Sequence, residues 1–408
     1  MIKPDGSQPP GPNTDAVPGL QGSVDGAVHK YMQSKRSAGL AVGVIADGEV
    51  FSFFHGSNGR DGSATPDENC IFEVGSITKV FTATLLADMH LRKEVHLDDP
   101  VNKYLPASAK LPSRGGVDVT LRHLATHTSG LPRLPENLSG TNFNAANPYA
   151  HYTEEDLYVC LAKTRLTSKP GTKSNYSNLG FGLLGHVLAK AAGTDFETLI
   201  KQRICKPLGL IDTTIHLSQE QQQRLAAGHS GGKRVLNWDL AALAGAGALR
   251  SSLRDMLRFL RANLEPSSTP LEAALNFAHE IQTERKYRFY RDFGCVAPLV
   301  VAGLSGVFVW RSFGLPVWAR VTTILAIPAV MFYFWPLGLS TMTLGWHVDD
   351  LLCDKPVLWH NGGTGGYASY MAFLREPPHG VIVLANSDQE PDSVARKLLQ
   401  GLPSKPAG

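Results

Sequence analysis

A short polar motif that leads directly into an apolar segment constrains the fold of this chain more than any other feature. Ser76 and Lys79 are three residues apart, and residues 80–89 form an apolar run with helical character. On a helix this spacing places both side chains on one face, within reach of each other. A lysine whose pKa is lowered by burial can then take the hydroxyl proton and make the serine a nucleophile. The alternative is a helix-capping serine followed by a surface lysine.

The same spacing occurs a second time, at Ser230 and Lys233. Here Gly231 and Gly232 separate the two polar residues. Two adjacent glycines disfavour a helix, so no shared helical face is expected. We interpret this second copy as a loop without catalytic meaning.

A second polar motif lies in the middle of the chain. Tyr176 and Asn178 are two residues apart and follow a turn-rich segment at residues 169–173. In an extended segment, residues two apart point to the same side, so both side chains can face one site. A simple turn is the alternative interpretation.

A third motif near the C-terminus is rich in glycine. Residues 359–367 read Trp-His-Asn-Gly-Gly-Thr-Gly-Gly-Tyr. Glycines permit the backbone to approach a ligand closely. The run lacks the Gly-Lys-Ser/Thr ending of a phosphate-binding loop, and a flexible loop is the alternative.

In this order the three motifs resemble those of the serine β-lactamase and penicillin-binding protein superfamily. The Tyr-Ser-Asn form of the second motif is similar to that of class C β-lactamases, D-alanyl-D-alanine carboxypeptidases and family VIII esterases. Three supporting segments are also similar to this group: residues 121–132, 178–185 and 245–252. The resemblance covers roughly residues 25–270 and 344–400.

The resemblance implies an α/β (α+β) fold in which an antiparallel sheet, flanked by helices and built from both chain ends, adjoins an all-helical region. We expect one β-lactamase/transpeptidase-like catalytic domain over residues 20–402, with its site in the cleft between the two parts. The sheet part is expected at about residues 20–95 and 344–402, and the helical part at about 96–275.

Local patterns in the chain predict elements that agree with this plan. Two apolar runs around Asp47-Gly48 predict a hairpin of strands over residues 39–46 and 49–54. The other predicted elements are strands over 367–373 and 380–385 and helices over 23–37, 252–261 and 391–400. The helix at 252–261 carries an apolar stripe of Leu253, Met256, Leu257 and Leu260.

The resemblance also implies a mechanism, which is acyl transfer through a covalent ester on Ser76. Lys79 and Tyr176 would share the proton transfer, and the sequence leaves open which of them is the general base. Tyr176 would act as a phenolate only if the nearby Lys79 cation lowered its pKa. Water would then hydrolyse the ester, activated near Tyr176.

The remaining site residues are assigned by the same resemblance. Asn178 would orient Lys79 and hydrogen-bond the substrate. The oxyanion hole would consist of the backbone N–H groups of Ser76 and Gly363. The substrate-binding and orienting residues are expected to be Asn178, His360, Asn361 and Gly362.

One departure from the class C pattern concerns charge. The third motif of those enzymes begins Lys-Thr-Gly, whereas this chain has His360-Asn361-Gly362. Histidine is only partly charged near neutral pH, and asparagine carries no charge. We therefore expect a weaker preference for anionic β-lactams than in a dedicated β-lactamase.

Several substrates remain open within this chemistry. β-Lactam hydrolysis is the leading prediction, followed closely by D-alanyl-D-alanine carboxypeptidase activity and then by carboxylesterase activity. Ester hydrolysis would lead if the site faced the cytoplasm. A non-enzymatic alternative is a β-lactam sensor module that is acylated but deacylates slowly.

Composition excludes some classes of function. A net charge of +3, without a basic stripe, argues against nucleic acid as a partner. The five cysteines are widely spaced and are expected to be buried free thiols. His123 and His127 have the spacing of a zinc-protease helix but lack its glutamate, so we expect neither a metal nor a cofactor. The expected partner is a small-molecule substrate.

Two segments lie outside the catalytic pattern. Residues 1–19 are rich in proline and predict a disordered tail without a signal peptide. Residues 293–339 contain two charge-free apolar runs close to membrane-spanning length, bracketed by arginines and aromatic residues. They predict an inserted apolar helical hairpin in contact with a membrane, with a surface helix pair or a dimer-forming flap as alternatives. The predicted location is therefore membrane-associated or periplasmic, although basic residues before the hairpin favour a cytoplasmic side.

Overall fold

A hairpin of apolar strands forms one side of the central sheet in the computed structural model. The structure describes residues 19–34, 38–60, 64–140, 142–283, 341–349 and 355–402. It divides into two units, residues 1–282 with 341–408, and residues 283–340. The following description concerns the first unit, because residues 284–340 lie outside the described ranges.

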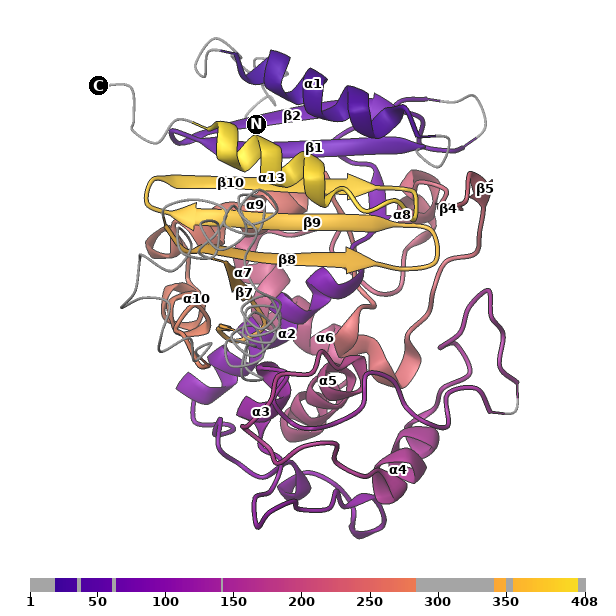
Figure 1. Ribbon diagram of the computed structural model, residues 1–408, viewed down its shortest axis with the longest axis vertical. Helices are drawn as coiled ribbons and strands as arrows, with labels where there is room; N and C mark the ends of the chain where they lie inside the picture. Colours follow the sequence, from indigo (N-terminus) through magenta and orange to yellow (C-terminus); the bar gives the residue numbers. More distant parts are fainter. Residues whose placement is uncertain are drawn as a thin grey trace, which may run out of the picture. The chain divides into compact units, whose positions relative to one another are not determined.

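The sheet has six antiparallel strands in the order β2-β1-β10-β9-β8-β7 (Figure 1). Both chain ends contribute, since Leu40 of β1 pairs with Ala385 of β10. The strands are β1 (Gly39–Ala46), β2 (Glu49–Gly56), β7 (His347–Asp349), β8 (Val357–Gly363), β9 (Ala368–Arg375) and β10 (Pro378–Ala385). The fold class expected from the sequence is thus confirmed.

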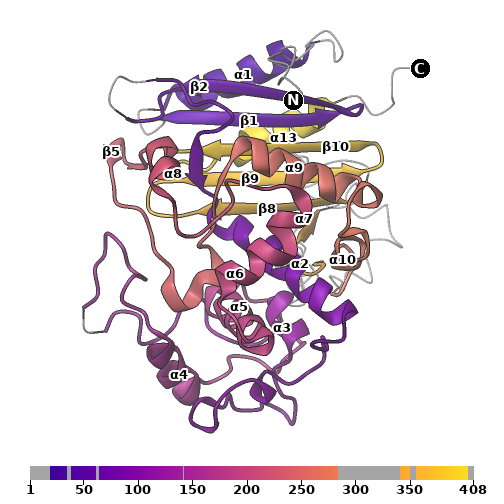
Figure 2. The same ribbon diagram turned by 180° about the vertical axis from the view of Figure 1, so that it is seen from behind.

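Helices cover both faces of this sheet. On one face lie α1 (Leu20–Met32) and α13 (Asp392–Gly401). On the other lie α2 (Thr78–Leu91), α9 (Leu253–Leu264) and α10 (Glu272–Ala278), as the view from behind shows (Figure 2). Strand β1 is buried along its whole length because alternate side chains enter the two cores, which explains its uninterrupted apolar sequence.

Helix α9 packs closely against strand β1 of the sheet. The four predicted stripe residues of α9 are all buried. A Cβ at Gly43 would lie 2.7 Å from Leu257 Cδ2, so a glycine in β1 is required for this approach. The buried face of α9 thus follows directly from its sequence period.

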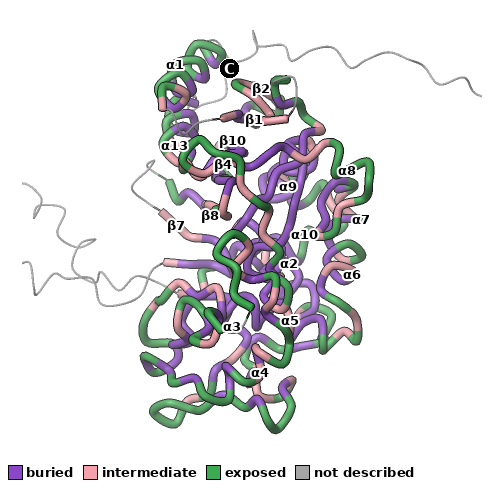
Figure 3. Tube along the Cα trace, turned by 90° about the vertical axis from the view of Figure 1, so that its right-hand side faces the viewer, coloured by how far each residue is buried: buried purple, intermediate pink, exposed green. Residues whose placement is uncertain are grey.

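The region between the sheet-forming ends contains most of the remaining helices, but it also holds short strands, whereas an all-helical region was expected. Its helices are α3 (Leu121–Ala125), α4 (Glu154–Lys163), α5 (Asn178–Ala192), α6 (Phe196–Ile200), α7 (Lys206–Leu208) and α8 (Gln219–Arg224). Two small antiparallel sheets pair β3 (Ile71–Glu73) with β6 (Arg250–Ser252), and β4 (His229–Ser230) with β5 (Lys233–Arg234). Figure 3 shows the buried trace continuing from the sheet through α2 into α5.

Shorter helical turns connect these elements. The 3-10 turns are Gly75–Ile77, Val101–Lys103, Ala107–Ala109, Ala241–Ala246 and Pro266–Ser268, and Lys201–Cys205 is a π-helical turn. Gly231 and Gly232 both have positive φ in the turn between β4 and β5. The second serine–lysine pair therefore spans a hairpin and shares no helical face.

Three other predictions can be compared with the structure only in part, because some of their residues lie outside the described ranges. Cys70, Cys160 and Cys205 are free and buried, whereas Cys295 and Cys353 are outside the described ranges. The predicted tail lies almost wholly outside them, and the predicted hairpin at residues 293–339 lies wholly outside. None of the helices in the described ranges combines the length and hydropathy needed to cross a bilayer.

Candidate active site

The first motif lies where a 3-10 turn runs into helix α2. Ser76 is in the turn Gly75–Ile77 and Lys79 is in the first turn of α2. Lys79 Nζ lies 2.9 Å from Ser76 Oγ. The α2 N-cap residue is Ile77 and has no side-chain cap, so the serine hydroxyl is not used for helix capping.

The amine of Lys79 is completely buried in a polar niche. Besides Ser76 Oγ, it contacts Asn178 Oδ1 at 3.0 Å and the carbonyl oxygen of Ala246 at 2.6 Å. Burial, and to a lesser extent the Arg133 charge, hold the Lys79 pKa well below its ordinary value. A neutral amine has two N–H donors and one lone pair. Once deprotonated, Lys79 Nζ can keep donating to Asn178 and Ala246 and turn its lone pair to the serine hydroxyl, to which the ammonium form donates.

The second motif lies at the start of helix α5. Ser177 is the N-cap, with its Oγ accepting a hydrogen bond from Gly180 N at 2.9 Å and donating to Pro132 O at 2.6 Å. Asn178 is the first helical residue, whereas Ser177 before it is extended, so the motif is not extended throughout as the sequence predicted. Asn178 reaches Lys79 from the helix start instead.

The ring of Tyr176 lies beside the amine of Lys79, with Nζ 4.9 Å from the ring centroid. Burial raises the pKa of Tyr176 to about 12, although a hydrogen bond with Ser76 opposes the change. Burial also lowers the pKa of the Lys79 amine, which disfavours the cation that would have stabilised a phenolate. The phenol therefore retains its proton at neutral pH.

The third motif is the end of strand β8. His360 is fully buried on the face toward α2, and its Nδ1 lies 2.6 Å from the carbonyl oxygen of Asn361. Burial, followed by His347 and Lys79, holds the His360 pKa well below its ordinary value. The partial charge expected from the sequence is therefore absent, because the imidazole is neutral.

Asn361 corrects one assignment made from the sequence. Alternation along β8 places its side chain on the opposite face of the sheet from His360. Its Nδ2 lies 3.4 Å from Asp392 Oδ2 at the start of α13. The side chain is thus directed away from Ser76, and the structure does not support substrate binding by its amide.

Backbone groups of the first and third motifs approach each other closely. Gly75 has a φ of +51°, and a Cβ there would lie 2.7 Å from Gly363 N. A Cβ on Gly362 would lie 3.0 Å from Ser76 N. Only glycines permit this approach, which brings the N–H groups of Ser76 and Gly363 to one place.

Three residues of the site were not assigned to it from the sequence. His127 lies 4.4 Å from the Tyr176 ring between centroids, and His347 of β7 lies 5.3 Å from the His360 ring. Arg133 places its guanidinium carbon 4.9 Å from the Tyr176 ring centroid. His127 and Arg133 lie in or beside a segment that the motif search had marked, whereas His347 carries no sequence signal.

The histidine pair of the sequence search is not a metal site. His123 is engaged in the cap of α3, where its Nδ1 accepts from Thr120 N at 3.2 Å, while His127 Nδ1 accepts from Ser177 N at 3.1 Å. Within the described ranges no group of three histidine, cysteine, aspartate or glutamate side chains could hold a metal ion.

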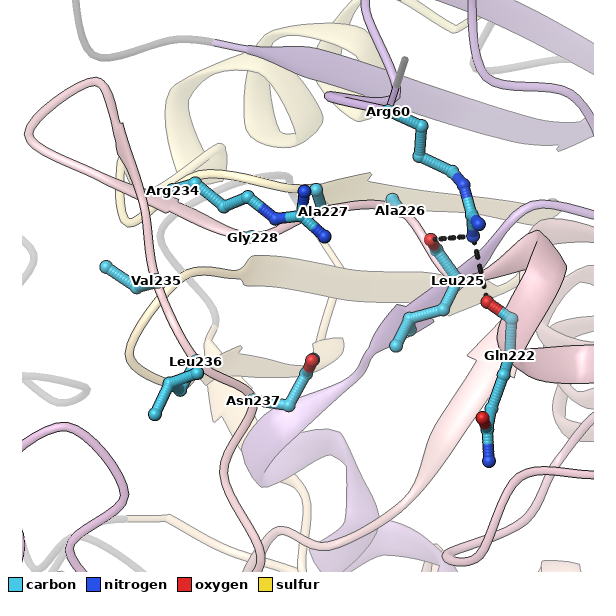
Figure 4. Close-up of a pocket in the computed structure, with 10 residues that line it drawn as sticks. All are labelled: Arg60, Gln222, Leu225, Ala226, Ala227, Gly228, Arg234, Val235, Leu236 and Asn237. Carbon is cyan, nitrogen blue, oxygen red and sulfur yellow. Dashed lines mark hydrogen bonds between the residues drawn. The ribbon is translucent and has the colours of Figure 1, made fainter.

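A cavity of about 190 Å³ lies apart from the three motifs (Figure 4). Arg60 closes one side of it, donating to the carbonyl oxygens of Gln222 and Leu225 at 2.8 and 2.9 Å. Asn237, on another side, donates to Glu73 at 3.0 Å. None of the residues of the three motifs lines this cavity. We therefore assign no catalytic role to the cavity and place the chemistry at Ser76, where the motifs meet.

The chain is similar along most of its length to several known proteins. The family model described as Beta-lactamase matches residues 24–402. A beta-lactamase of Pseudomonas fluorescens is 28% identical over 373 residues, which are 90% of this chain and 93% of the relative. The D-alanyl-D-alanine-carboxypeptidase/endopeptidase AmpH of Escherichia coli (strain K12) is 32% identical over 349 residues, covering 85% of this chain and 79% of the relative.

A solved structure is similar in fold. It is the beta-lactamase/D-alanine carboxypeptidase from Yersinia pestis complexed with citrate, with a TM-score of 0.71 and 24% identity. The match covers 94% of this chain and 98% of the other. At this identity the likeness shows the fold alone.

Proposed function

Because this chain belongs to the beta-lactamase family and is a serine hydrolase, we propose that it hydrolyses β-lactams through an ester on Ser76. The observation that carries the proposal is the buried Lys79 amine, which lies 2.9 Å from Ser76 Oγ and has a strongly lowered pKa. A general base must reach the proton that it removes and must be unprotonated at the working pH. Lys79 meets the first condition by its distance, and its burial shifts the pKa in the direction that the second condition requires.

In the acylation step, Ser76 Oγ attacks the lactam carbonyl carbon while its proton passes to Lys79. The N–H groups of Ser76 and Gly363 stabilise the negative charge that develops on the carbonyl oxygen. The C–N bond then breaks, and the leaving nitrogen receives a proton from Tyr176, which Lys79 restores. The product of this step is a single acyl ester on Ser76, in which the opened lactam ring still carries the amine.

Deacylation uses the same groups in the opposite direction. Water attacks the ester carbonyl carbon, Lys79 accepts its proton, and Ser76 Oγ leaves and is reprotonated from Lys79. Asn178 holds the Lys79 amine in place during both steps through its 3.0 Å contact. The substrate class is small molecules, consistent with the relatives named above.

A second candidate substrate is a peptide ending in D-alanyl-D-alanine. Its terminal carboxylate would meet a neutral His360 just as the carboxylate of a β-lactam would, so the charge at this position does not separate the two candidates. The 32% identity to a D-alanyl-D-alanine-carboxypeptidase/endopeptidase supports the peptide candidate. The attack on the carbonyl and the proton transfers would be unchanged.

Intact mass recorded over time after mixing with excess benzylpenicillin tests the proposal, with Ser76→Ala in parallel. We expect an adduct that requires Ser76 and disappears once penicillin is consumed. A persistent adduct would favour the peptidase candidate or a sensor. No adduct, together with ester hydrolysis that requires Ser76, would refute β-lactam hydrolysis and favour an esterase.

A further inference from the structure

Arg133 belongs to the loop that follows α3, and its backbone is fixed to the second motif. Its carbonyl oxygen accepts hydrogen bonds from Asn178 N at 2.9 Å and from Leu179 N at 3.2 Å. The preceding carbonyl, of Pro132, accepts the Ser177 hydroxyl at 2.6 Å. Arg133 is thus held in register with Tyr176 and Asn178.

The side chain of Arg133 is exposed and lies against the Tyr176 ring. With its guanidinium carbon 4.9 Å from the ring centroid, the contact is a cation–π interaction that restrains an otherwise flexible side chain. It makes no hydrogen bond or ion pair with any part of the chain that the structure describes. The N–H donors of the guanidinium therefore remain free for a ligand.

The other basic groups near Ser76 do not offer a permanent charge. Lys79 is buried with a strongly lowered pKa, and the same is true of His360. Arg250 is committed to Glu73 at 3.3 Å. Compared with these groups, all in the described ranges, Arg133 is therefore the cation without an ion-pair partner. It lies on the loop after α3 and not in the third motif.

We propose that Arg133 determines specificity by binding a carboxylate on the leaving-group side of the substrate. The inference rests on the proposed function, in which Tyr176 protonates the leaving group. A cation on the Tyr176 ring lies on that same side. Guanidinium and carboxylate form a charge-assisted, bidentate pair, which suits a small acidic leaving group. Arg133 would thus supply, from the loop after α3, the preference for anionic substrates that the third motif lacks without its lysine.

A pair of aryl esters that differ by one carboxylate tests this assignment. The substrates are 3-carboxyphenyl acetate and phenyl acetate, and the quantity is the ratio of their kcat/KM values. Arg133→Ala should lower this ratio about 10- to 100-fold, the loss expected for a hydrogen-bonded charge pair. Arg133→Lys should retain part of it, since lysine keeps the charge but loses the bidentate geometry.

Lys173→Ala is the matched control. Lys173 is exposed three residues before Tyr176, and its removal changes the net charge by the same amount. Its ratio should stay within about twofold of the unmodified protein, because exposed charges beyond contact are screened. If Lys173→Ala lowered the ratio as much as Arg133→Ala, general electrostatics would replace the proposed contact.

The remaining outcomes distinguish a failure of the Arg133 assignment from a failure of the proposed serine acyl transfer. An equal loss on both esters would overturn the inference, because it would show that Arg133 acts through Tyr176 and not on the carboxylate. Full retention of kcat/KM on both esters in Arg133→Ala would also overturn it. If the unmodified protein hydrolysed neither ester, the proposed serine acyl transfer would fail first, and the Arg133 assignment would fall with it.

Discussion

Replacing Tyr176 by phenylalanine separates the two roles that the phenol could have. With a Tyr176 pKa of about 12, only about one molecule in 10⁵ carries a phenolate at pH 7. Using that minor form as a base would add about 7 kcal/mol to the barrier. We therefore expect the phenol to act as an acid toward the leaving group, with Lys79 as the base.

The acid role predicts a loss that depends on the leaving group. An amine leaving group needs a proton, whereas p-nitrophenolate departs without one. Tyr176→Phe should lower kcat/KM for benzylpenicillin by about 10²- to 10⁴-fold, the usual contribution of general acid catalysis. For p-nitrophenyl acetate the loss should be at least tenfold smaller.

The assay is kcat/KM for both substrates between pH 5 and 10, measured on Tyr176→Phe and on Tyr158→Phe. Tyr158 is a suitable control because its hydroxyl also has a partner, His186 Nε2 at 2.9 Å, but belongs to α4. Equal losses on both substrates would refute the acid role. So would a rate in the unmodified protein that continues to rise above pH 9, which would indicate a phenolate base.

Three further predictions concern the backbone, the lysine and acid stability. Gly75→Ala should lower kcat about 10²- to 10³-fold, because a Cβ 2.7 Å from Gly363 N displaces an oxyanion donor. Steady-state kinetics measure kcat, and an unchanged melting temperature shows that the variant is folded. A retained kcat in the folded variant would contradict this prediction. Asn178→Ala should slow acylation about 5- to 30-fold by freeing the Lys79 amine, and stopped-flow acylation at the normal rate would exclude that role. His279 is buried with its pKa lowered to about 3, so the unfolded chain binds more protons below pH 6.5 and stability falls as the pH decreases through this range. His279→Gln should reduce the loss of unfolding free energy between pH 7 and 5 by about 2 kcal/mol, and denaturant titrations that give the same loss would contradict the assignment.

The sequence predicted the parts of the fold that depend on local periodicity. The apolar runs around Asp47-Gly48 became β1 and β2, and the stripe of α9 is buried as its spacing required. The predicted helix at 391–400 differs from α13 by one residue at each end. Such sequence patterns predict the observed elements because the period of the apolar side chains determines which face of a helix or strand is buried.

The site was predictable only where its residues form motifs. Ser76 and Lys79 are neighbours on a helix, so their contact follows from their spacing. His347 comes from a three-residue strand far along the chain, and nothing local marks it. Similarly, the lowered pKa of His360 arises from tertiary burial, which a sequence motif does not encode.

The chain leaves the catalytic unit after Gln282 and returns to it at Thr341. The two edges of this opening are joined, since Gln282 N donates to Met342 O at 2.9 Å and Leu344 N donates to Ala278 O at 3.1 Å. Backbone hydrogen bonds between described residues thus join the two edges at this point. Evolution could therefore exchange that stretch as a cassette, lengthening or replacing it while the nucleophile, its base and the sheet stay in place, because longer loops cost little extra closure entropy.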